Sequence, residues 1–305
     1  MAAYLSETTE TSTLTLALIQ MTSGKTLEKN FEFLSEQIDE AVKQGATYIQ
    51  SPENSLLMEL NPKEVARITT SEAYKDALQQ LFLKAAAQKI WLHIGSAAVP
   101  LTDHQDAGNG QFKFANRSYL IGPDYSPATA DTHLFFYDKI HMFDVTLPNG
   151  EHYNESASYQ AGESSVVAGC NFSNTHAPQN ISIKLGMTIC YDLRFPSLFH
   201  HLARSGAEII SVPAAFTKTT GEAHWHILLR ARAIETGCFI VAAGQTGKHD
   251  NGRETFGHSL VISPWGDILL DAGTEPGVYS CQIDLRQVER TRQIVPSLSH
   301  GKDFQ

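Results

Sequence analysis

Hydrophobic and polar positions follow two different periods along the first hundred residues. Residues 14–21 form a short apolar run typical of a buried strand, and residues 26–43 carry apolar side chains at helical spacing before Gly45. The same order recurs in a short run at 46–50, a helical segment at 71–88 and an apolar run at 90–99. Strands that alternate with helices in this way predict an α/β fold.

The rest of the chain adds more strands and then repeats the alternation. Strands are expected at 117–121 and 133–143, an exposed excursion at 148–162, and a strand at 181–190 that leads into a helix at 193–205. A strand at 207–213, a helix at 222–236, a strand at 239–244, a hairpin at 257–272 and a strand at 278–283 follow. Because no fixed-period repeat or low-complexity linker interrupts the pattern, we expect a polar tail, 1–12, and one domain, 13–305.

Composition and charge exclude several classes of protein. With 42% hydrophobic and 18% charged residues the chain has the composition of a folded protein. The net charge of −10 and the absence of adjacent basic residues make nucleic acid and anionic membranes poor partners. No segment has the length and hydrophobicity of a membrane span, and the polar start lacks the features of a secretory signal. The cysteines are widely spaced without any CxxC pair, which predicts reduced thiols and a cytoplasmic location; they are Cys170, Cys190, Cys238 and Cys281.

Cys190 is the candidate nucleophile. It ends an apolar strand and precedes a predicted helix, and a strand-to-helix turn can present a thiol outward near a helix N-terminus, which favours the thiolate. A buried structural thiol is the other interpretation, because free cysteine is among the most buried residue types. Taken alone, Cys190 does not decide between them.

Two charged residues offer the rest of an acyl-transfer site. Lys139 lies in an apolar run, where an ammonium group needs water or a partner; in a pocket it could stabilise an oxyanion. Glu53 follows a short strand and Pro52, and a carboxylate near a thiol can act as general base. Each is also compatible with a surface position. Together with Cys190 they form a complete set for nucleophilic amide hydrolysis.

The segments around these residues resemble the Glu, Lys and Cys motifs of the nitrilase superfamily, in the same order. The matching segments are SPEN at 51–54, YDKIH at 137–141 and GMTICYDLRFP at 186–196. The likeness continues through GAEI at 206–209, PAAF at 213–216, TGEAHW at 220–225, LRARAIE at 229–235, and from GHS at 257–259 to WG at 265–266. It covers nearly all of the chain beyond the first dozen residues and is strongest for the Nit branch of the superfamily.

This resemblance implies a four-layer αββα sandwich and a homodimer. It also implies Cys190 as nucleophile, Lys139 as electrostatic stabiliser and Glu53 as base, with neither metal nor cofactor. The spacing of the histidines also argues against a metal site. His200 and His201 are adjacent and His224 and His226 are two apart, so neither pair shares a helix face.

The resemblance further suggests residues that bind the substrate. Glu155 corresponds to a second pocket glutamate, which would orient Lys139 or the substrate, although a solvated loop glutamate is the alternative. The backbone N–H of Tyr191 would join the oxyanion site, and Arg194 could pair with a substrate carboxylate unless it is a surface arginine. Phe216 and Thr220 would line the mouth or simply pack in the loop.

The expected substrate is a small amide. Nit-branch enzymes act as deaminated glutathione amidases or as ω-amidases on α-ketoglutaramate, and residues 228–245 resemble the former type. A carbamoylase, a nitrilase or a catalytically silent binding protein are the alternatives. The chain departs from the family pattern at Gln50-Ser51, before Pro52-Glu53, and in a polar insertion at 102–111, which affects substrate details more than the chemistry.

Overall fold

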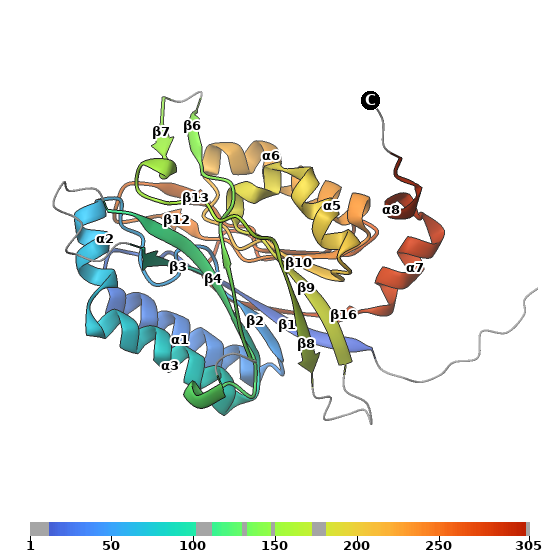
Figure 1. The fold of residues 1–305 in the computed structure, drawn as a ribbon, viewed down its shortest axis with the longest axis horizontal. Helices are drawn as coiled ribbons and strands as arrows, with labels where there is room; N and C mark the ends of the chain where they lie inside the picture. Colours follow the sequence, from blue (N-terminus) through green and yellow to red (C-terminus); the bar gives the residue numbers. More distant parts are fainter. Residues whose placement is uncertain (1–11, 102–111, 130–132, 148–149, 173–180, 303–305) are drawn as a thin grey trace, which may run out of the picture.

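The structure is a computed structural model that describes residues 12–101, 112–129, 133–147, 150–172 and 181–302 (Figure 1). The expected insertion at 102–111 and all of the polar tail except Ser12 lie outside the described residues. None of the helices in these ranges has the length and hydrophobicity needed to cross a membrane.

The first sheet has six strands in the order β16-β1-β2-β3-β4-β5. Strands β1, β2 and β3 run parallel, and the flanking pairs β1–β16, β3–β4 and β4–β5 are antiparallel. The strands are β1 (Thr13–Gln20), β2 (Tyr48–Gln50), β3 (Trp91–Pro100), β4 (Phe114–Ile121), β5 (Leu134–Asp138) and β16 (Gly277–Asp284).

The second sheet repeats this arrangement in the order β15-β14-β11-β10-β9-β8. Strands β9, β10 and β11 are parallel, with antiparallel neighbours on both sides. The strands are β8 (Val166–Phe172), β9 (Ile181–Met187), β10 (Ile209–Ser211), β11 (Phe239–Ala242), β14 (Leu260–Ile262) and β15 (Ile268–Asp271). The two sheets therefore have the same topology without a detectable sequence repeat, and the C-terminal strand β16 completes the first one.

Helices cover the outer face of each sheet, so the layers run αββα as expected (Figure 1). Helices α1 (Leu27–Lys43) and α3 (Glu72–Gln88) lie on the first sheet, and α5 (Pro196–Arg204) and α6 (Lys218–Thr236) lie on the second. The remaining elements are helices α2 (Pro62–Thr69), α7 (Arg286–Ile294) and α8 (Ser297–His300) and the hairpins β6 (Asp144–Thr146) with β7 (His152–Asn154) and β12 (Thr246–Lys248) with β13 (Glu254–Phe256).

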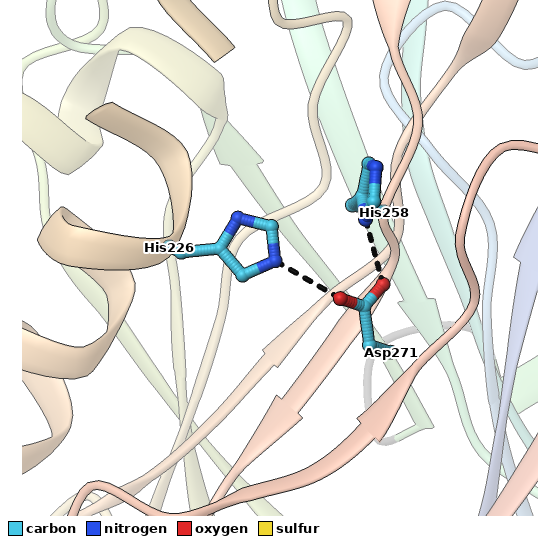
Figure 2. Close-up of side chains that lie close together, drawn as sticks. All are labelled: His226, His258 and Asp271. Carbon is cyan, nitrogen blue, oxygen red and sulfur yellow. Dashed lines mark hydrogen bonds and ion pairs between the residues drawn. The ribbon is translucent and has the colours of Figure 1, made fainter. Parts of the chain in front are cut away.

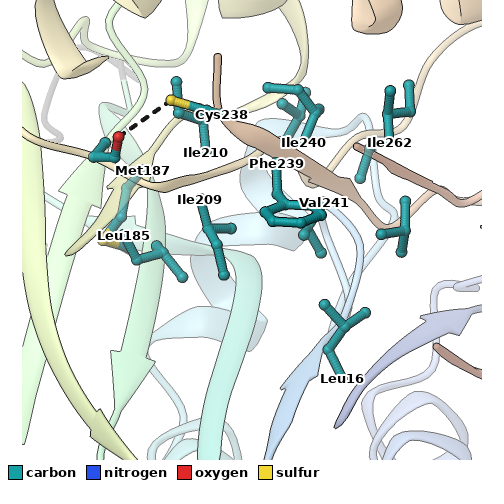
Figure 3. Packing of buried hydrophobic residues seen from close by; sticks show 14 of the residues in the cluster. Leu16, Leu185, Met187, Ile209, Ile210, Cys238, Phe239, Ile240, Val241 and Ile262 are labelled. Carbon is teal, nitrogen blue, oxygen red and sulfur yellow. Dashed lines mark hydrogen bonds between the residues drawn. The ribbon is translucent and has the colours of Figure 1, made fainter. Parts of the chain in front are cut away.

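The alternation in β1 explains how one strand serves two cores. Leu16 and its neighbours two residues away point between the sheets, where they pack with residues of the second sheet such as Ile209 and Phe239 (Figure 3). Ala17 and Ile19 point the other way, into a separate core beneath α1 and α3. Burial of both strand faces accounts for the continuous apolar run that identified this strand.

Several expected boundaries differ from the structure. The expected strand at 133–143 ends at Asp138, and the helix expected from 193 begins at Pro196, after a 3-10 turn over Cys190–Arg194. Proline favours the first helical position, which explains the later start. The excursion at 148–162 contains strand β7, and α2 was not predicted.

Candidate active site

Three charged or nucleophilic side chains meet where strands of both sheets end. Glu53 lies three residues beyond β2, Lys139 directly follows β5, and Cys190 lies three residues beyond β9. All three line one pocket with a volume of about 240 Å³. The carboxyl ends of strands are the usual place for a site in an α/β fold.

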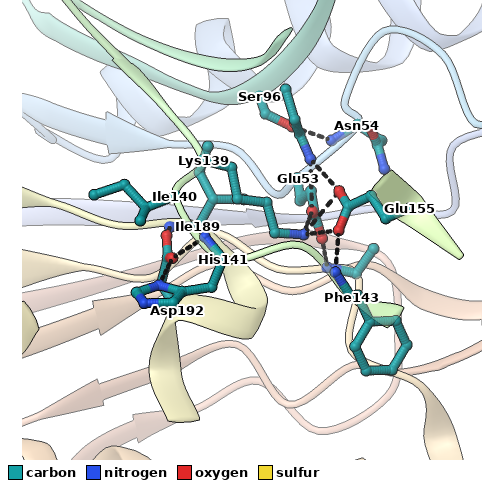
Figure 4. A network of polar contacts seen from close by, with 12 residues as sticks. Glu53, Asn54, Ser96, Lys139, Ile140, His141, Phe143, Glu155, Ile189 and Asp192 are labelled. Atoms are coloured by element: carbon teal, nitrogen blue, oxygen red, sulfur yellow. Dashed lines mark hydrogen bonds and ion pairs between the residues drawn. The ribbon is translucent and has the colours of Figure 1, made fainter. Parts of the chain in front are cut away.

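Lys139 is buried between two glutamates (Figure 4). Its Nζ donates to Glu53 Oε1 at 3.0 Å and to Glu155 Oε1 and Oε2 at 2.9 and 2.8 Å. Glu155 is fixed in turn, because its Oε2 accepts a 2.7 Å hydrogen bond from the N–H of Phe143. The structure thus brings together Lys139 and both glutamates, and explains why an ammonium follows an apolar strand.

The second carboxylate oxygen of Glu53 is held by backbone. Its Oε2 accepts from the N–H of Ala215 at 2.8 Å, and its Oε1 also accepts from Asn116 Nδ2 at 2.9 Å. Asn116 donates to Glu155 Oε1 as well, at 3.2 Å, so it bridges the two carboxylates. Asn116 gives no signal in the sequence, because it lies within an ordinary strand pattern.

Opposite charges determine the protonation of this cluster. Burial by itself raises the pKa of Glu53, but the nearby Lys139 and Arg253 outweigh it and the pKa is lowered. Burial disfavours the charged form of Lys139, yet Glu155 and Glu53 raise its pKa above the ordinary value. Glu53 is therefore an ionised base and Lys139 a cation at neutral pH.

Cys190 sits on a strained turn with its backbone fixed. Its φ is 48°, in the left-handed region, and its N–H donates to the Pro213 carbonyl at 2.9 Å. Burial, followed by the charge of Glu53, raises the pKa of the thiol despite the opposing influence of Lys139. Because its pKa is raised, the Cys190 thiol needs a nearby base to form the attacking thiolate, and its role as nucleophile stays a prediction. Glu53 is the base that shares the pocket with this thiol, and the two groups shift each other's pKa.

Asp192 fixes the Cys190 turn against the Lys139 segment. Its buried carboxylate accepts from the N–H of Ile189 at 2.8 Å and from the Tyr137 hydroxyl at 2.7 Å. It also accepts from the N–H of His141 at 3.1 Å. Asp192 belongs to the segment that matches the Cys motif of the family. The sequence did not predict that this side chain is buried.

Arg253 brings a second positive charge to the pocket and was also not identified from sequence. It lies between β12 and β13, lines the cavity that contains Cys190, and donates through Nη2 to the Ala215 carbonyl. Its Nε is buried and has no hydrogen-bond partner among the described residues. A partly exposed guanidinium whose buried Nε lacks a partner among the described residues is suited to bind a carboxylate.

Of the other residues expected to bind substrate, three line a cavity and one does not. Tyr191, Phe216 and Thr220 line a small recess that also contains Cys190. Arg194 lies outside the lining of both cavities, with its guanidinium 5.3 Å from the ring centre of Phe216 and 3.4 Å from His224 Nδ1. Arg194 therefore lies next to a residue that lines the recess, whereas Arg253 lines both the pocket and the recess.

Comparison with known proteins agrees with the fold. Residues 15–293 match the carbon-nitrogen hydrolase family. A deaminated glutathione amidase of Synechocystis sp. is 39% identical over 93% of this chain and 96% of its own length. One from Yersinia enterocolitica is 36% identical over 94% of this chain and 92% of its own length. The crystal structure of the NitFhit protein of C. elegans superposes with a TM-score of 0.79 at 33% identity, over 96% of this chain and 66% of that one.

These matches define the class of the protein. The chain belongs to the carbon-nitrogen hydrolase family, the nitrilase superfamily that its motifs resemble. It is a hydrolase of carbon–nitrogen bonds other than peptide bonds, and within that class an amidase.

Proposed function

We propose that this amidase hydrolyses deaminated glutathione to α-ketoglutarate and Cys-Gly through a Cys190 thioester. The observation that carries the proposal is the enclosure of the Cys190 thiol, the ionised Glu53 and the cationic Lys139 in one pocket with Arg253. The names of the relatives from Synechocystis sp. and Yersinia enterocolitica support the substrate.

In the first half-reaction the Cys190 sulfur bonds to the amide carbonyl carbon while Glu53 takes the thiol proton. The oxyanion accepts a hydrogen bond from the backbone N–H of Tyr191, near the start of the 3-10 turn. The positive charge of Lys139 stabilises the oxyanion electrostatically, while the three N–H donors of Lys139 stay bonded to Glu53 and Glu155. When the carbonyl re-forms, the C–N bond breaks and Glu53 passes its proton to the leaving amine. The product on the enzyme is a thioester.

In the second half-reaction Glu53 removes a proton from water, and the oxygen bonds to the thioester carbon. The C–S bond then breaks, and the proton returns from Glu53 to sulfur, so the enzyme is regenerated. Glu155 keeps Lys139 aligned in both steps through its two hydrogen bonds. No cofactor or metal enters either step.

The substrate's free carboxylate is assigned to Arg253. Its Nε donor is buried without a partner among the described residues, and its positive charge acts on both Glu53 and Cys190. Arg194 would contribute from its position next to Phe216. Thr220 and Phe216 would shape the recess behind Cys190.

A side-by-side assay of deaminated glutathione and α-ketoglutaramate tests the proposal. We expect a larger kcat/KM for deaminated glutathione, with Cys-Gly released in equal amount to α-ketoglutarate. The Cys190→Ala variant should be inactive towards both, with unchanged thermal unfolding as evidence of folding. Turnover by this variant at the wild-type rate would refute the mechanism, and preference for α-ketoglutaramate would assign the enzyme as an ω-amidase.

Two alternatives from the sequence give different results in the same assay. A carbamoylase or nitrilase would prefer N-carbamoyl amino acids or nitriles. A catalytically silent binding protein would turn over none of these compounds and would form no acyl-enzyme detectable by mass spectrometry.

We further propose that the protein is a homodimer that covers an apolar face of α6. Ile227 and Ile234 lie seven residues apart on one side of the helix and are 69% and 54% exposed. Trp265, 56% exposed, lies in the turn whose Gly266 carbonyl accepts from Arg230 of the same helix. Analytical ultracentrifugation should give twice the chain mass, and Ile227→Asp should shift the protein to monomer.

A reducing compartment, such as the cytoplasm, fits the four free cysteines, three of which are buried. We propose cytoplasmic location on this basis, with a small amide as the partner and no nucleic acid or membrane. Fractionation of cells with an antibody to the protein tests the location directly.

A further inference from the structure

Two histidines and an aspartate from separate parts of the chain come together beside α6 (Figure 2). His226 Nε2 lies 3.0 Å from Asp271 Oδ2, and His258 Nδ1 lies 2.8 Å from Asp271 Oδ1. One ligand atom from each residue can be chosen so that all three lie within 4.8 Å of one another. None of these residues lines either cavity that contains Cys190.

The three side chains come from separate elements. His226 lies on α6, Asp271 ends β15, and His258 lies between β13 and β14. The sequence prediction considered only histidines close together on one helix. Here only His226 comes from α6, and the other two donors lie in the segment from β13 to the end of β15. The sequence therefore could not show this cluster.

Surrounding contacts hold the donors in place. His258 has a φ of 51°, and its backbone is fixed by the 2.6 Å bond from its N–H to the Gly273 carbonyl. Trp225 Nε1 donates to the His258 carbonyl at 2.8 Å. The Phe256 ring stacks on His258 at 4.5 Å between centres and meets the His226 ring edge-on at 5.9 Å. The N–H of Gly273 donates to Asp271 Oδ1 at 2.9 Å.

We propose that His226, His258 and Asp271 form a binding site for a divalent transition-metal ion such as zinc. Two imidazole nitrogens and one carboxylate are a common ligand set for zinc, whereas calcium and magnesium prefer oxygen ligands alone. Zinc sites place ligands about 2.0–2.2 Å from the metal, so small side-chain rotations would bring these three atoms onto one ion. The side chains are 31%, 26% and 34% exposed, which leaves room for water in a fourth position.

The bound ion would join α6 to the hairpin β14–β15. It lies outside the pocket of Cys190, so its effect is on stability and not on the acyl-transfer chemistry. A ligand that binds only the folded chain raises the unfolding temperature.

Zinc titration of the full-length Cys190→Ala protein tests the site, because this variant removes the thiol that could also bind zinc in the pocket. Isothermal titration calorimetry should show one zinc ion per chain. His226→Ala, His258→Ala and Asp271→Asn, each in this background, should lower the affinity at least about tenfold, since even outer contacts of a metal site change affinity by this amount. The matched control is His200→Ala, which removes a partly exposed histidine of α5.

Two further measurements test the zinc site without using enzyme activity, so that their outcome does not depend on the proposed amidase substrate. Zinc should raise the unfolding temperature of the Cys190→Ala protein by several degrees and should not do so in the His226→Ala variant. Cobalt(II) in place of zinc should give visible d–d bands without a thiolate charge-transfer band. The proposal is overturned if the protein binds no zinc, or if the three variants bind it as tightly as the His200→Ala control.

Discussion

His141 and Asp192 are joined twice. The backbone N–H of His141 donates to Asp192 Oδ1 at 3.1 Å, and the His141 ring Nδ1 lies 2.6 Å from the same oxygen. His141 is two residues beyond Lys139, and Asp192 is two residues beyond Cys190. This contact therefore sets the position of the cationic group relative to the nucleophile, although neither His141 nor Asp192 lines the pocket.

Asp192→Asn should lower kcat by about a hundredfold, because a displacement of about 1 Å at a reacting group can have this effect. An amide cannot accept the hydrogen bonds of Ile189, Tyr137 and His141 with both of its terminal atoms. KM should change less than kcat, since substrate contacts remain. Steady-state kinetics with α-ketoglutaramate measures both.

Asp138→Asn is the matched control for this substitution. Asp138 adjoins Lys139 in sequence, but its carboxylate pairs with Arg117, and both side chains are partly exposed. Neither Asp138 nor Arg117 lines the pocket, so this variant should retain near wild-type kcat even if the loss of the bidentate ion pair lowers stability. Equal losses in the two variants would show that Asp192 does not act through Cys190 and Lys139.

The activity should have a wide pH plateau. The reaction needs Glu53 ionised, and its pKa lies below the ordinary value of 4.5, because Lys139 and Arg253 outweigh burial. It needs Lys139 protonated, and its pKa lies above the ordinary value of 10.5, because the glutamates outweigh burial. The plateau of kcat/KM should thus extend from about pH 5 to about pH 9. A steep change in kcat/KM for α-ketoglutaramate near pH 7 would contradict these protonation states.

Gly95→Ala should destabilise the protein and disturb the site together. A Cβ on Gly95 would lie 2.5 Å from Pro213 Cβ and closer still to the Ser51 carbonyl oxygen. Ser51 precedes the Glu53 turn, and the Pro213 carbonyl holds the N–H of Cys190. We expect a loss of about 1–3 kcal/mol in the free energy of unfolding. Urea denaturation measures it.

Gly169→Ala is the control for the added methyl group. Gly169 is in β8, and a Cβ there meets nothing within 4 Å. Its stability should stay the same or rise slightly, because alanine is less flexible in the unfolded chain. If both variants lost the same stability, the cause would be strand propensity and not the close packing at Gly95.

The sequence could suggest those candidate site residues whose chemistry differs from that of the apolar segments around them. Glu53 and Cys190 follow apolar strands and Lys139 lies in an apolar run, so the chemistry of all three contrasts with their surroundings. Asn116 gave no such signal, because it lies within a strand, and Arg253 lies in a polar stretch that resembles a surface turn. Their roles depend on which loops meet above the sheets, and that is set by long-range packing between the halves of the chain.

The fold also has features that the sequence could predict and features that it could not. The alternation of strands and helices was predicted well, because each element is buried on a regular face. The end of β5 at Asp138 could not be predicted, since the apolar run continues to Phe143. The strand ends there because Lys139 turns into the polar cluster of Glu53 and Glu155.

The two arginines should differ in their effect on substrate binding. Arg253→Met should lower kcat/KM for α-ketoglutaramate roughly 10- to 100-fold, because a hydrogen bond to a charged group is worth about 1.5–3 kcal/mol. Arg194→Met should have a smaller effect, because Arg194 lies next to Phe216 and does not line the pocket. Both variants should be compared by steady-state kinetics.

A neutral amide of similar length, butyramide, separates carboxylate binding from other roles of Arg253. If Arg253 binds the carboxylate, its replacement should affect α-ketoglutaramate strongly and butyramide little. An equal loss on both amides would mean that Arg253 acts through its charge on Glu53 and Cys190, whose pKa values it lowers. A loss confined to Arg194→Met would place the carboxylate at the mouth, beside Phe216, as the sequence first suggested.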